Sequence, residues 1–345
     1  MRKISVGIIG ATGYTGSELV RILINHPGVT ITLITSESRQ GELFSDVHPF
    51  FKGIADHKLE SLDNIENYNL DLVFLALPHG ISMNFVKRFH DSKFKIIDLS
   101  GDFRLDSAET YFEWYQKEHV YPQGIDAAVY GLPEINAGKI RAAELVANPG
   151  CFPTSAILGT APLLSGKLAD PGLVIIDSKS GVTGAGVKAK TVTHFSNVND
   201  NFKAYGLKRH RHTIEIQETL EKLTDGKTII QFTPHLLPVD RGILSTIYLR
   251  PLVEVSETVL RETYHSFYKK APFVRLRENV PAIKDVRGTN YCDICVNYDE
   301  RTGMIIVISV IDNLVKGAAG QAVQNMNLMT GFNETEGLNQ VPVNP

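Results

Sequence analysis

The sequence predicts two domains of different fold class: an α/β domain that begins with a dinucleotide-binding unit, and an α+β domain with a mostly antiparallel sheet. Three observations lead to this prediction. The chain has 345 residues, more than one hydrophobic core usually supports. Residues 4–23 have the pattern of a strand, a glycine-rich turn and a helix. After residue 228, strand-like runs recur with a single helical segment among them.

The composition is typical of a water-soluble enzyme and argues against several other classes. Hydrophobic residues make up 43% and charged residues 21% of the chain, and the net charge is -3. Such a chain lacks the basic surface that nucleic acid or an anionic membrane requires, and no apolar run approaches the ~20 residues that span a bilayer. Three cysteines are too few for a disulfide framework. We therefore expect a cytoplasmic protein with no nucleic-acid or membrane partner.

The first βα unit has the features of a pyrophosphate site. An apolar run at residues 4–9 leads into a glycine-rich turn at residues 10–16, and a helical face follows. Glycines let the backbone approach phosphates, and a helix N-terminus attracts their charge. The spacing is G-x-x-G-x-x-G instead of G-x-G-x-x-G, so a tight turn without a ligand is the alternative. The candidate cofactor-binding residues of this turn are Gly10, Thr12, Gly13, Tyr14, Thr15 and Gly16.

The end of the second strand bears on the choice of cofactor. This strand, at residues 30–35, runs into Ser36, Glu37, Ser38 and Arg39. An acid near this point binds the ribose 2′-hydroxyl of NAD, whereas an arginine accommodates a 2′-phosphate. Both are present, so charge alone is ambiguous. Because two serines and an arginine can surround a phosphate while Glu37 points away, we favour NADP over a solvated loop.

Two further strands, at residues 72–77 and 95–99, also end in polar loops. Ligands of open α/β sheets bind beyond the carboxyl ends of the strands, so both loops are placed to meet cofactor or substrate. In the first loop, Pro78 and His79 are candidates, with His79 either a lid residue or a helix-start residue. In the second loop, Arg104 is suited to an anionic group, with an exposed surface ion pair as the alternative. A helix is expected at residues 111–120 and a short strand at residues 145–147.

A cysteine lies between two prolines in residues 148–154, which read NPGCFPT. Proline is favoured at the first helical position, so Pro153 marks the expected start of the next helix. Cys151 would then lie beside the positive end of a helix dipole, where the nucleophilic thiolate is favoured. An inert, buried cysteine is an equally good interpretation of this placement taken alone.

The second half carries a dense cluster of cations and imidazoles. A strand at residues 173–177 is followed by a glycine-rich loop at 178–186, and an irregular polar stretch runs over 191–206. Then come Arg209, His210, Arg211 and His212 ahead of a helix, with Thr213 as the expected N-cap. Such a cluster suits an anionic substrate and proton transfer near neutral pH. No acid or cysteine cluster lies nearby in the sequence, so we expect no metal site.

The remaining segments predict the α+β domain. Strand-like runs occur at residues 229–233, 243–249, 273–276, 291–296 and 304–310, with a helix at 256–270 among them. A sheet of this size offers a broad face for dimer packing. Cys292 and Cys295 lie three apart in one strand and so face opposite sides, which disfavours joint zinc ligation. A last helix is expected from residue 317 to about 329.

These residues resemble those of the N-acetyl-γ-glutamyl-phosphate reductase family of arginine biosynthesis. The cysteine segment together with the His-Arg-His segment is highly specific, whereas the glycine turn alone is not. The related aspartate-semialdehyde dehydrogenases place their histidine after a later strand, where residues 237–242 (LPVDRG) contain none. The resemblance covers essentially the whole chain and rests on residues 10–16, 77–80, 98–104, 148–154, 180–186, 210–212 and 316–321.

The resemblance implies a Rossmann domain at residues 1–150 and 314–345, whose last helix returns to it, and a catalytic and dimerisation domain at residues 151–313. It also implies NADPH as reductant, an acyl-phosphate substrate and a homo-oligomer, either a dimer or a tetramer. The implied reaction reduces N-acetyl-L-glutamyl 5-phosphate to the 5-semialdehyde through a Cys151 thioester. An N-succinyl or carrier-linked glutamyl phosphate is an alternative substrate, and aspartate-semialdehyde dehydrogenase is the nearest alternative activity.

Roles for single residues follow from the resemblance. Cys151 is the expected nucleophile, and His212 is the expected general acid/base, with His210 as the other candidate. Arg104 matches the phosphate-binding arginine of the related dehydrogenases, and Gln321 matches an amide that meets the nicotinamide carboxamide. Our own assignment gives the substrate carboxylate to Arg209 or Arg211. Three more residues complete the set: Asn148 for substrate, and Ser180 and Gly181 for cofactor.

Overall fold

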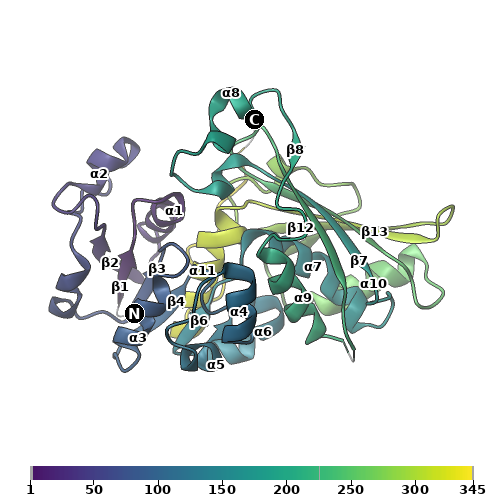
Figure 1. Cartoon of the computed structure of the whole chain (residues 1–345), viewed down its shortest axis with the longest axis horizontal. Coiled ribbons are helices and arrows are strands. Elements are labelled where there is room, and N and C mark those ends of the chain that lie inside the picture. The colour runs from purple at the N-terminus through teal and green to yellow at the C-terminus, as the bar shows by residue number, and fades with distance from the viewer. Residues whose placement is uncertain (1–2, 225, 344–345) are drawn as a thin grey trace. The chain divides into compact units, whose positions relative to one another are not determined.

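The computed structural model describes residues 3–224 and 226–343 (Figure 1). The chain divides into two compact units. Unit 1 comprises Met1–Pro149 and Ala318–Asn339, and unit 2 comprises Gly150–Gly317 and Gln340–Pro345. Within the described residues, no helix is long and apolar enough to cross a membrane.

Unit 1 is built on a six-stranded parallel sheet in the order β2-β1-β3-β4-β6-β5. The central strands β3 and β4 are almost wholly buried, as expected for a sheet covered on both faces. Because all the strands are parallel, their carboxyl ends meet at one edge. The strands are β1 (Ile4–Ile9), β2 (Val29–Thr35), β3 (Leu72–Leu75), β4 (Lys95–Asp98), β5 (Val129–Tyr130) and β6 (Leu145–Ala147).

The last helix, α11 (Gly320–Thr330), packs in unit 1 against α1, α6 and β4. Its residues from Gly320 to Met329 are all buried, and it is preceded by a short π-helical turn, η6 (Val315–Ala319). The other helices of this unit are α1 (Tyr14–Leu23), α2 (Phe44–Val47), η1 (Pro49–Phe51), η2 (Leu62–Asn67), α3 (Ser82–Phe89), α4 (Ala108–Tyr115), α5 (Gln123–Ala127) and α6 (Pro133–Arg141).

Unit 2 is built on a seven-stranded sheet in the order β11-β12-β13-β10-β7-β9-β8. Four of its strand pairs are antiparallel, while β7–β9 and β11–β12 are parallel, so the sheet is mixed with an antiparallel majority. The strands are β7 (Val174–Ser180), β8 (Lys203–Ala204), β9 (Ile230–Leu236), β10 (Ile243–Leu249), β11 (Val274–Leu276), β12 (Cys292–Asp299) and β13 (Met304–Ile311).

Three helices cover one face of this sheet: α7 (Cys151–Ser165), α9 (His212–Glu221) and α10 (Glu257–Phe267) (Figure 1). Strands β7, β9 and β10 alternate buried residues with exposed or half-buried ones, so their other face is open within the single chain. Short elements complete unit 2: η3 (Val182–Ala185), η4 (Thr191–Thr193), α8 (Phe195–Val198) and η5 (Ile283–Asp285).

Most strand predictions hold to within three residues at each end, but four helix starts differ from expectation by two or three residues. One of them is that of α11, which begins at Gly320 and not at residue 317. Helix α7 begins at Cys151 and not at Pro153, because Gly150 has the extended backbone of an N-cap. Helix α9 begins at His212, with Arg211 and not Thr213 as its N-cap. Helix α4 begins three residues before its predicted start, because the Ser107 hydroxyl accepts a hydrogen bond from the Thr110 N–H.

Two other segments are more regular than expected. Residues 178–180 extend β7 instead of opening a loop, and the stretch 191–206 contains η4, α8 and β8. Helix α4 ends at Tyr115, where Gln116 takes the left-handed conformation with φ 54°. Pairing with β9 and β10 extends β7 through Ser180, whereas a left-handed residue ends α4 before its predicted end at residue 120.

Candidate active site

Cys151 is the first residue of the 15-residue helix α7 and is a half-buried free thiol. The residue before it, Gly150, donates its N–H to the carboxylate of Glu215 over 2.7 Å. Glu215 lies in the first turn of α9 and is almost fully buried. This bond ties the start of α7 to the start of α9. The helix dipole of α7 favours the thiolate form of a cysteine at this position.

The two histidines of the His-Arg-His segment lie against the same end of α7. The Phe152 ring makes edge contacts with His210 and His212, at centroid distances of 5.6 and 5.9 Å. The two imidazoles are 4.9 Å apart, and Phe232 contacts His210 from another side. The structure therefore brings Cys151, His210 and His212 together in unit 2, as the sequence predicts.

The two histidines differ in their environments. The backbone N–H of His212 donates to Nδ1 of His210 over 3.2 Å. Burial lowers the pKa of His210 to about 4, with the nearby Arg211 charge adding to the effect. His210 is thus neutral at pH 7, and because its Nδ1 accepts, its proton is on Nε2.

Tyr205 is a site residue that the sequence reasoning missed. Its ring lies edge-on to His210 at 5.5 Å. Burial and the neighbouring Cys151 thiol raise the pKa of the Tyr205 hydroxyl, which keeps it a neutral phenol. The only sequence signal was an aromatic residue in a polar stretch just ahead of the His-Arg-His segment.

Glu215 and Gly317 were also missed as site residues. A Cβ atom at Gly317 would lie 2.8 Å from the Cβ of Cys151, so only glycine allows this approach. The Gly317 N–H donates to the Asp312 carbonyl over 2.9 Å, and the Asp312 carboxylate accepts from the Leu314 N–H over 2.8 Å. The sequence placed Glu215 only as a first-turn acid of a helix and Gly317 only at a helix start.

The remaining predicted residues of unit 2 are distributed around this cluster. Arg209 and Arg211 are exposed and flank His210 in the chain. Ser180 ends β7, and the next residue, Gly181, donates its N–H to the Gly242 carbonyl over 2.9 Å. A Cβ at Gly181 would come within 2.8 Å of the backbone at residues 240 and 241, so close packing of two loops already requires a glycine there.

In unit 1, the glycine turn has one position with open space. Gly10 has φ +85°, and a Cβ there would lie 2.7 Å from the Ala76 carbonyl oxygen. A Cβ at Gly16 would meet the Ala11 backbone at 2.6 Å. In contrast, a Cβ at Gly13 would have no described atom within 4 Å. Gly13 is the N-cap of α1, and Tyr14 is the first residue of this helix. The turn itself therefore needs Gly10 and Gly16, whereas Gly13 leaves room for a ligand.

The loop after β2 can receive a 2′-phosphate. The Glu37 carboxylate accepts the Leu62 N–H over 3.0 Å, which occupies the acid that could bind a ribose hydroxyl. Arg39 is largely exposed and forms a surface ion pair with Glu42 at 3.1 Å, which is easily exchanged for another anion. Ser36 is buried, and its hydroxyl lies 3.2 Å from that of Thr12 in the glycine turn.

The loops after β3 and β4 hold the next predicted residues. His79 is half-buried, and its Nδ1 accepts the Gly101 N–H over 2.7 Å. It does not start a helix, since α3 begins at Ser82. Arg104 is 8% exposed and donates from Nη2 to the Leu99 carbonyl over 2.7 Å, so it is not a surface arginine. Pro78, which precedes His79 in the chain, is exposed.

Two buried amides lie at the end of β6 and on α11. Asn148 donates to the Ala318 carbonyl over 3.1 Å and accepts from Asn325 over 3.0 Å. Gln321 is fully buried and donates to the Gly131 carbonyl over 3.0 Å. Among the described atoms, the Gln321 Oε1 has no hydrogen-bond partner. A buried carbonyl without a donor is costly, and a carboxamide N–H of a bound nicotinamide would satisfy it.

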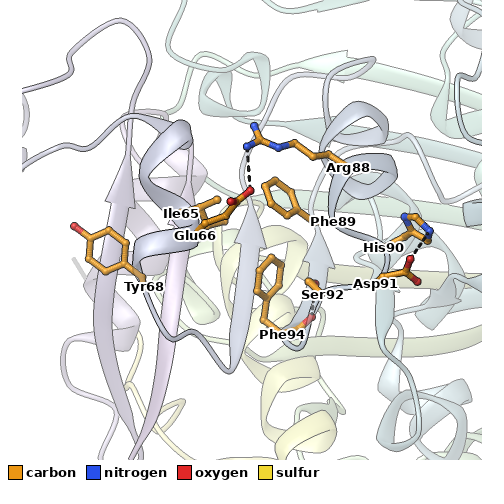
Figure 2. A pocket seen from close by; sticks show the side chains of 9 residues that line it. All are labelled: Ile65, Glu66, Tyr68, Arg88, Phe89, His90, Asp91, Ser92 and Phe94. Carbon is orange, nitrogen blue, oxygen red and sulfur yellow. Dashed lines mark hydrogen bonds and ion pairs between the residues drawn. The ribbon is translucent and has the colours of Figure 1, made fainter.

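A pocket of about 350 Å³ in unit 1 lies away from these residues (Figure 2). It is found beside the C-terminal end of α3 and before β4, at the sheet edge opposite the carboxyl ends of the strands. Figure 2 shows its charged groups paired, Arg88 with Glu66 at 3.3 Å and His90 with Asp91 at 3.1 Å. Within the part of the chain that the structure describes, no group of three or more His, Cys, Asp or Glu side chains is placed to hold a metal ion.

Comparison with known proteins defines the class of enzyme. The model of the semialdehyde dehydrogenase NAD-binding domain matches residues 5–143, and that of the semialdehyde dehydrogenase dimerisation domain matches residues 151–313. The fold is shared with aspartate semialdehyde dehydrogenase II of Vibrio cholerae, at a TM-score of 0.72 and 17% identity over 96% of this chain and 99% of that chain. The enzyme from Candida albicans, solved with NADP, has a TM-score of 0.69 and 15% identity over 95% of this chain and 98% of that chain. The two matching domain models and the shared fold thus define the chain as an oxidoreductase of the semialdehyde dehydrogenase class.

Relatives of higher identity define the family within this class. N-acetyl-gamma-glutamyl-phosphate reductase of Desulfotalea psychrophila is 52% identical over 99% of this chain and 100% of its own length. The enzymes so named from Citrifermentans bemidjiense and Bacillus subtilis are 50% and 46% identical, over 99% of this chain and 100% and 99% of their own lengths. The chain belongs to the N-acetyl-γ-glutamyl-phosphate reductase family, which confirms the predicted resemblance.

Proposed function

We propose that this protein catalyses the NADPH-dependent reduction of N-acetyl-L-glutamyl 5-phosphate to N-acetyl-L-glutamate 5-semialdehyde and phosphate, a step of arginine biosynthesis. The observation that carries the proposal is the Cys151 thiol at the start of α7, with the ring of Phe152 joining it to His210 and His212. A thiolate beside an imidazole is the arrangement needed for acyl transfer to cysteine. Membership of the N-acetyl-γ-glutamyl-phosphate reductase family identifies N-acetylglutamyl as the acyl group.

The first half of the reaction is acyl transfer. The Cys151 sulfur attacks the γ-carbonyl carbon of the acyl phosphate, the C–S bond forms, and the C–O bond to the phosphate breaks. Inorganic phosphate leaves with the electron pair, and a thioester remains. The positive end of the α7 dipole supports both the thiolate and the negative charge that develops on the carbonyl oxygen.

The second half needs one proton transfer in each direction. Bound NADPH supplies the hydride that reduces the thioester. We assign to His212 the proton that the carbonyl oxygen receives in this step. When the C–S bond breaks and the aldehyde leaves, His212 takes the proton back from the hydroxyl and Cys151 returns to the thiolate.

His210 is the less suitable acid/base of the two. Its Nδ1 already accepts the His212 N–H, and its pKa of about 4 is too low for proton transfer near neutral pH. We therefore propose His210 as a positioning residue that fixes the backbone of His212. Arg209 or Arg211 is proposed for the substrate carboxylate, because both guanidinium groups are exposed beside this cluster.

We assign cofactor binding to unit 1. The open space at Gly13 fits the pyrophosphate, and Ser36 with Arg39 fits the 2′-phosphate of NADP. The unpartnered Oε1 of Gln321 fits the nicotinamide carboxamide. Arg104 is proposed for the phosphate group of the substrate. We place the functional boundaries at residues 1–150 with 314–345 for the cofactor domain, and at 151–313 for the catalytic domain.

We further infer that unit 2 assembles with a second copy through the open face of its sheet. Ile175 on β7 and Tyr248 on β10 are paired in register, and each is 36% exposed there. The family model that matches residues 151–313 is named for dimerisation, which supports assembly through this domain. Three free cysteines suit a reducing compartment, so we propose the cytoplasm as its location.

The substrate test is phosphate-dependent oxidation of aldehydes by the purified protein with NADP. We expect N-acetylglutamate semialdehyde to have a kcat/KM at least about tenfold above that of N-succinylglutamate semialdehyde, and far above that of aspartate semialdehyde, since a missing or added group in a fitted pocket is worth 10–200-fold. A preference for the succinyl compound or for aspartate semialdehyde would replace the proposed substrate with that one.

The nucleophile test compares single cysteine variants. Cys151→Ser should lose at least about 10³-fold in kcat, because a serine hydroxyl is a far weaker nucleophile at neutral pH. Cys292→Ser and Cys295→Ser are the controls, since both thiols are buried in β12, and each should keep the wild-type rate. Iodoacetamide should alkylate Cys151 first. Near-wild-type turnover in Cys151→Ser would rule out the thioester.

A further inference from the structure

We propose that the Asp102 carboxylate is a positioning residue for the anionic substrate: it locks together the two loops that carry His79 and Arg104. This inference rests on the proposed function, because it concerns how the phosphate-bearing end of the substrate is held. Both loops follow parallel strands, β3 and β4, at the sheet edge where ligands of such folds bind.

The carboxylate of Asp102 joins the loop after β4 to the loop after β3. Its Oδ1 accepts the Gly80 N–H over 2.7 Å, and its Oδ2 accepts the Met83 N–H over 3.1 Å. The Tyr111 hydroxyl donates to Oδ1 over 2.9 Å. Asp102 is 1% exposed, so water does not compete with these three bonds.

The bond to Met83 also completes the start of α3. The N-cap residue of this helix, Ile81, has no side chain that can accept from the first-turn N–H groups. A carboxylate at a helix N-terminus satisfies such a donor and meets the positive end of the dipole. Asp102 therefore caps α3 from a separate loop, which fixes residues 80–83 relative to β4.

The backbone of Asp102 is also fixed by hydrogen bonds. Its N–H donates to the Ser100 hydroxyl over 3.1 Å, and that hydroxyl donates to the Asp98 carboxylate over 2.7 Å. The Asp102 carbonyl accepts from His119 Nε2 over 2.8 Å. The Nδ1 of His119 accepts the Tyr121 N–H over 3.2 Å, so the proton of this ring is on Nε2. Burial lowers the pKa of His119.

The same loops orient Arg104, which we propose for the phosphate group of the substrate, and His79, which we now assign to the same anion. Gly101, next to Asp102, donates its N–H to His79 Nδ1, which leaves the proton of a neutral His79 ring on Nε2. Arg104 lies two residues after Asp102, and its guanidinium group donates a hydrogen bond to the Leu99 carbonyl. If the Asp102 bonds are lost, the loop after β3 is released, and the His79 ring loses its fixed distance from Arg104. Anion binding then weakens because the two donors no longer point to one place.

The test uses the full-length enzyme and two variants in phosphate-dependent oxidation of the aldehyde. Asp102→Asn keeps the size but turns one acceptor into an N–H₂ that faces a backbone N–H. Tyr111→Phe removes a single hydrogen bond and keeps the carboxylate, so it remains informative if Asp102→Asn does not fold. We expect the KM for phosphate to rise about tenfold or more in Asp102→Asn and about threefold in Tyr111→Phe, with kcat within about threefold of the wild type.

Two further measurements separate positioning from general damage. The rate at which iodoacetamide alkylates Cys151 without ligands should stay within about twofold of the wild type, because that thiol belongs to unit 2. Asp126→Asn is the control, since Asp126 is an exposed aspartate of the same unit, and it should change neither constant. An unchanged phosphate KM in both Asp102→Asn and Tyr111→Phe, or a loss of alkylation equal to the loss of activity, would overturn the inference. Absence of phosphate-dependent oxidation in the wild type would instead reject the proposed function; the dissociation constant of inorganic phosphate, measured by calorimetry, would then decide the inference.

Discussion

At the scale of single residues, the environment of Cys151 is set by its two chain neighbours and by one distant glycine. Gly150 gives its N–H to Glu215, and Phe152 contacts both imidazoles. Gly317 has no side chain that would crowd the cysteine Cβ. The thiol is thus half-buried among groups that fix its backbone.

The histidine assignment predicts different kinetic losses in two variants. His212→Asn should lower kcat by about 10²–10⁴-fold, the usual contribution of general acid/base catalysis. His210→Asn should lower it only by about tenfold, because an asparagine oxygen can still accept the His212 N–H. Steady-state kinetics at pH 7 measures both. An equal loss in the two variants, with the same limb of the pH–rate profile removed, would contradict the assignment.

The wild type and His210→Asn should also differ in how their free energy of unfolding depends on pH. The folded pKa of His210 is about 4 and its unfolded value is 6.5, so the unfolded chain binds the extra proton in this window. Stability from this group therefore rises with pH between 4 and 6.5. Relative to His210→Asn, the wild type should lose free energy of unfolding on the order of 3 kcal/mol as the pH falls from 6.5 to 4. Urea unfolding across this range, on both proteins, checks the difference.

At the scale of elements, hydrophobic runs bounded by turn residues were readable from the sequence. The bounds of β1 and β10 coincide with the predicted runs at 4–9 and 243–249. The start of α7 was not readable, because it depends on Gly150, whose N–H meets a carboxylate 65 residues further along the chain. Proline is tolerated throughout a first helical turn, so Pro153 does not mark the first residue.

The residues of the candidate site fall into two groups in the same way: some are identified by local sequence, and others only by contacts with distant segments. Cys151, His210 and His212 were selected from residue type and spacing, and the structure places them near one another. Tyr205, Glu215 and Gly317 act through contacts with distant segments, and no local pattern announces such contacts. Arg104 was selected as a candidate from its position after a strand, but its burial could not be inferred from a loop sequence.

The glycine turn allows a clean test of cofactor contact. Gly13→Ala places a methyl group where no described atom lies within 4 Å, and Gly13 has φ -79°, which alanine adopts easily. The loss of an N-cap glycine should cost the fold at most about 1 kcal/mol. If the pyrophosphate packs against this position, the Kd for NADPH should rise at least about tenfold while the melting temperature changes little. Fluorescence titration with NADPH and thermal denaturation provide the two readings.

Gly138→Ala is the matched control for this substitution. Gly138 lies within α6 and also has no described atom within 4 Å of the added Cβ. Alanine should stabilise that helix by roughly 0.5–1 kcal/mol and leave the NADPH affinity unchanged. An unchanged affinity in Gly13→Ala as well would place the pyrophosphate elsewhere.

At the scale of the whole molecule, the chain enters and leaves unit 2 close to the nucleophile. The first boundary falls between Pro149 and Gly150, and the second between Gly317 and Ala318. Gly150 precedes Cys151, and Gly317 packs against it. The thiol proposed as the nucleophile therefore lies where the chain of unit 2 begins and ends. The cofactor residues proposed for unit 1 belong to the first glycine turn, to the loop after β2 and to the start of α11.

If copies of the chain meet through the open face of the unit 2 sheet, charged substitutions on that face should prevent assembly. Ile175 and Tyr248 are opposite each other on β7 and β10, on the sheet face that α7, α9 and α10 leave open. In the double variant Ile175→Asp, Tyr248→Asp, each interface would have to bury carboxylates without partners, which costs several kcal/mol. The variant should therefore sediment as a monomer at micromolar concentration, whereas the wild type should sediment as a dimer or tetramer. Phe50→Asp is the control, because Phe50 is 69% exposed in unit 1, outside the proposed face. Sedimentation of the double variant at the wild-type mass would show that the copies meet through another surface.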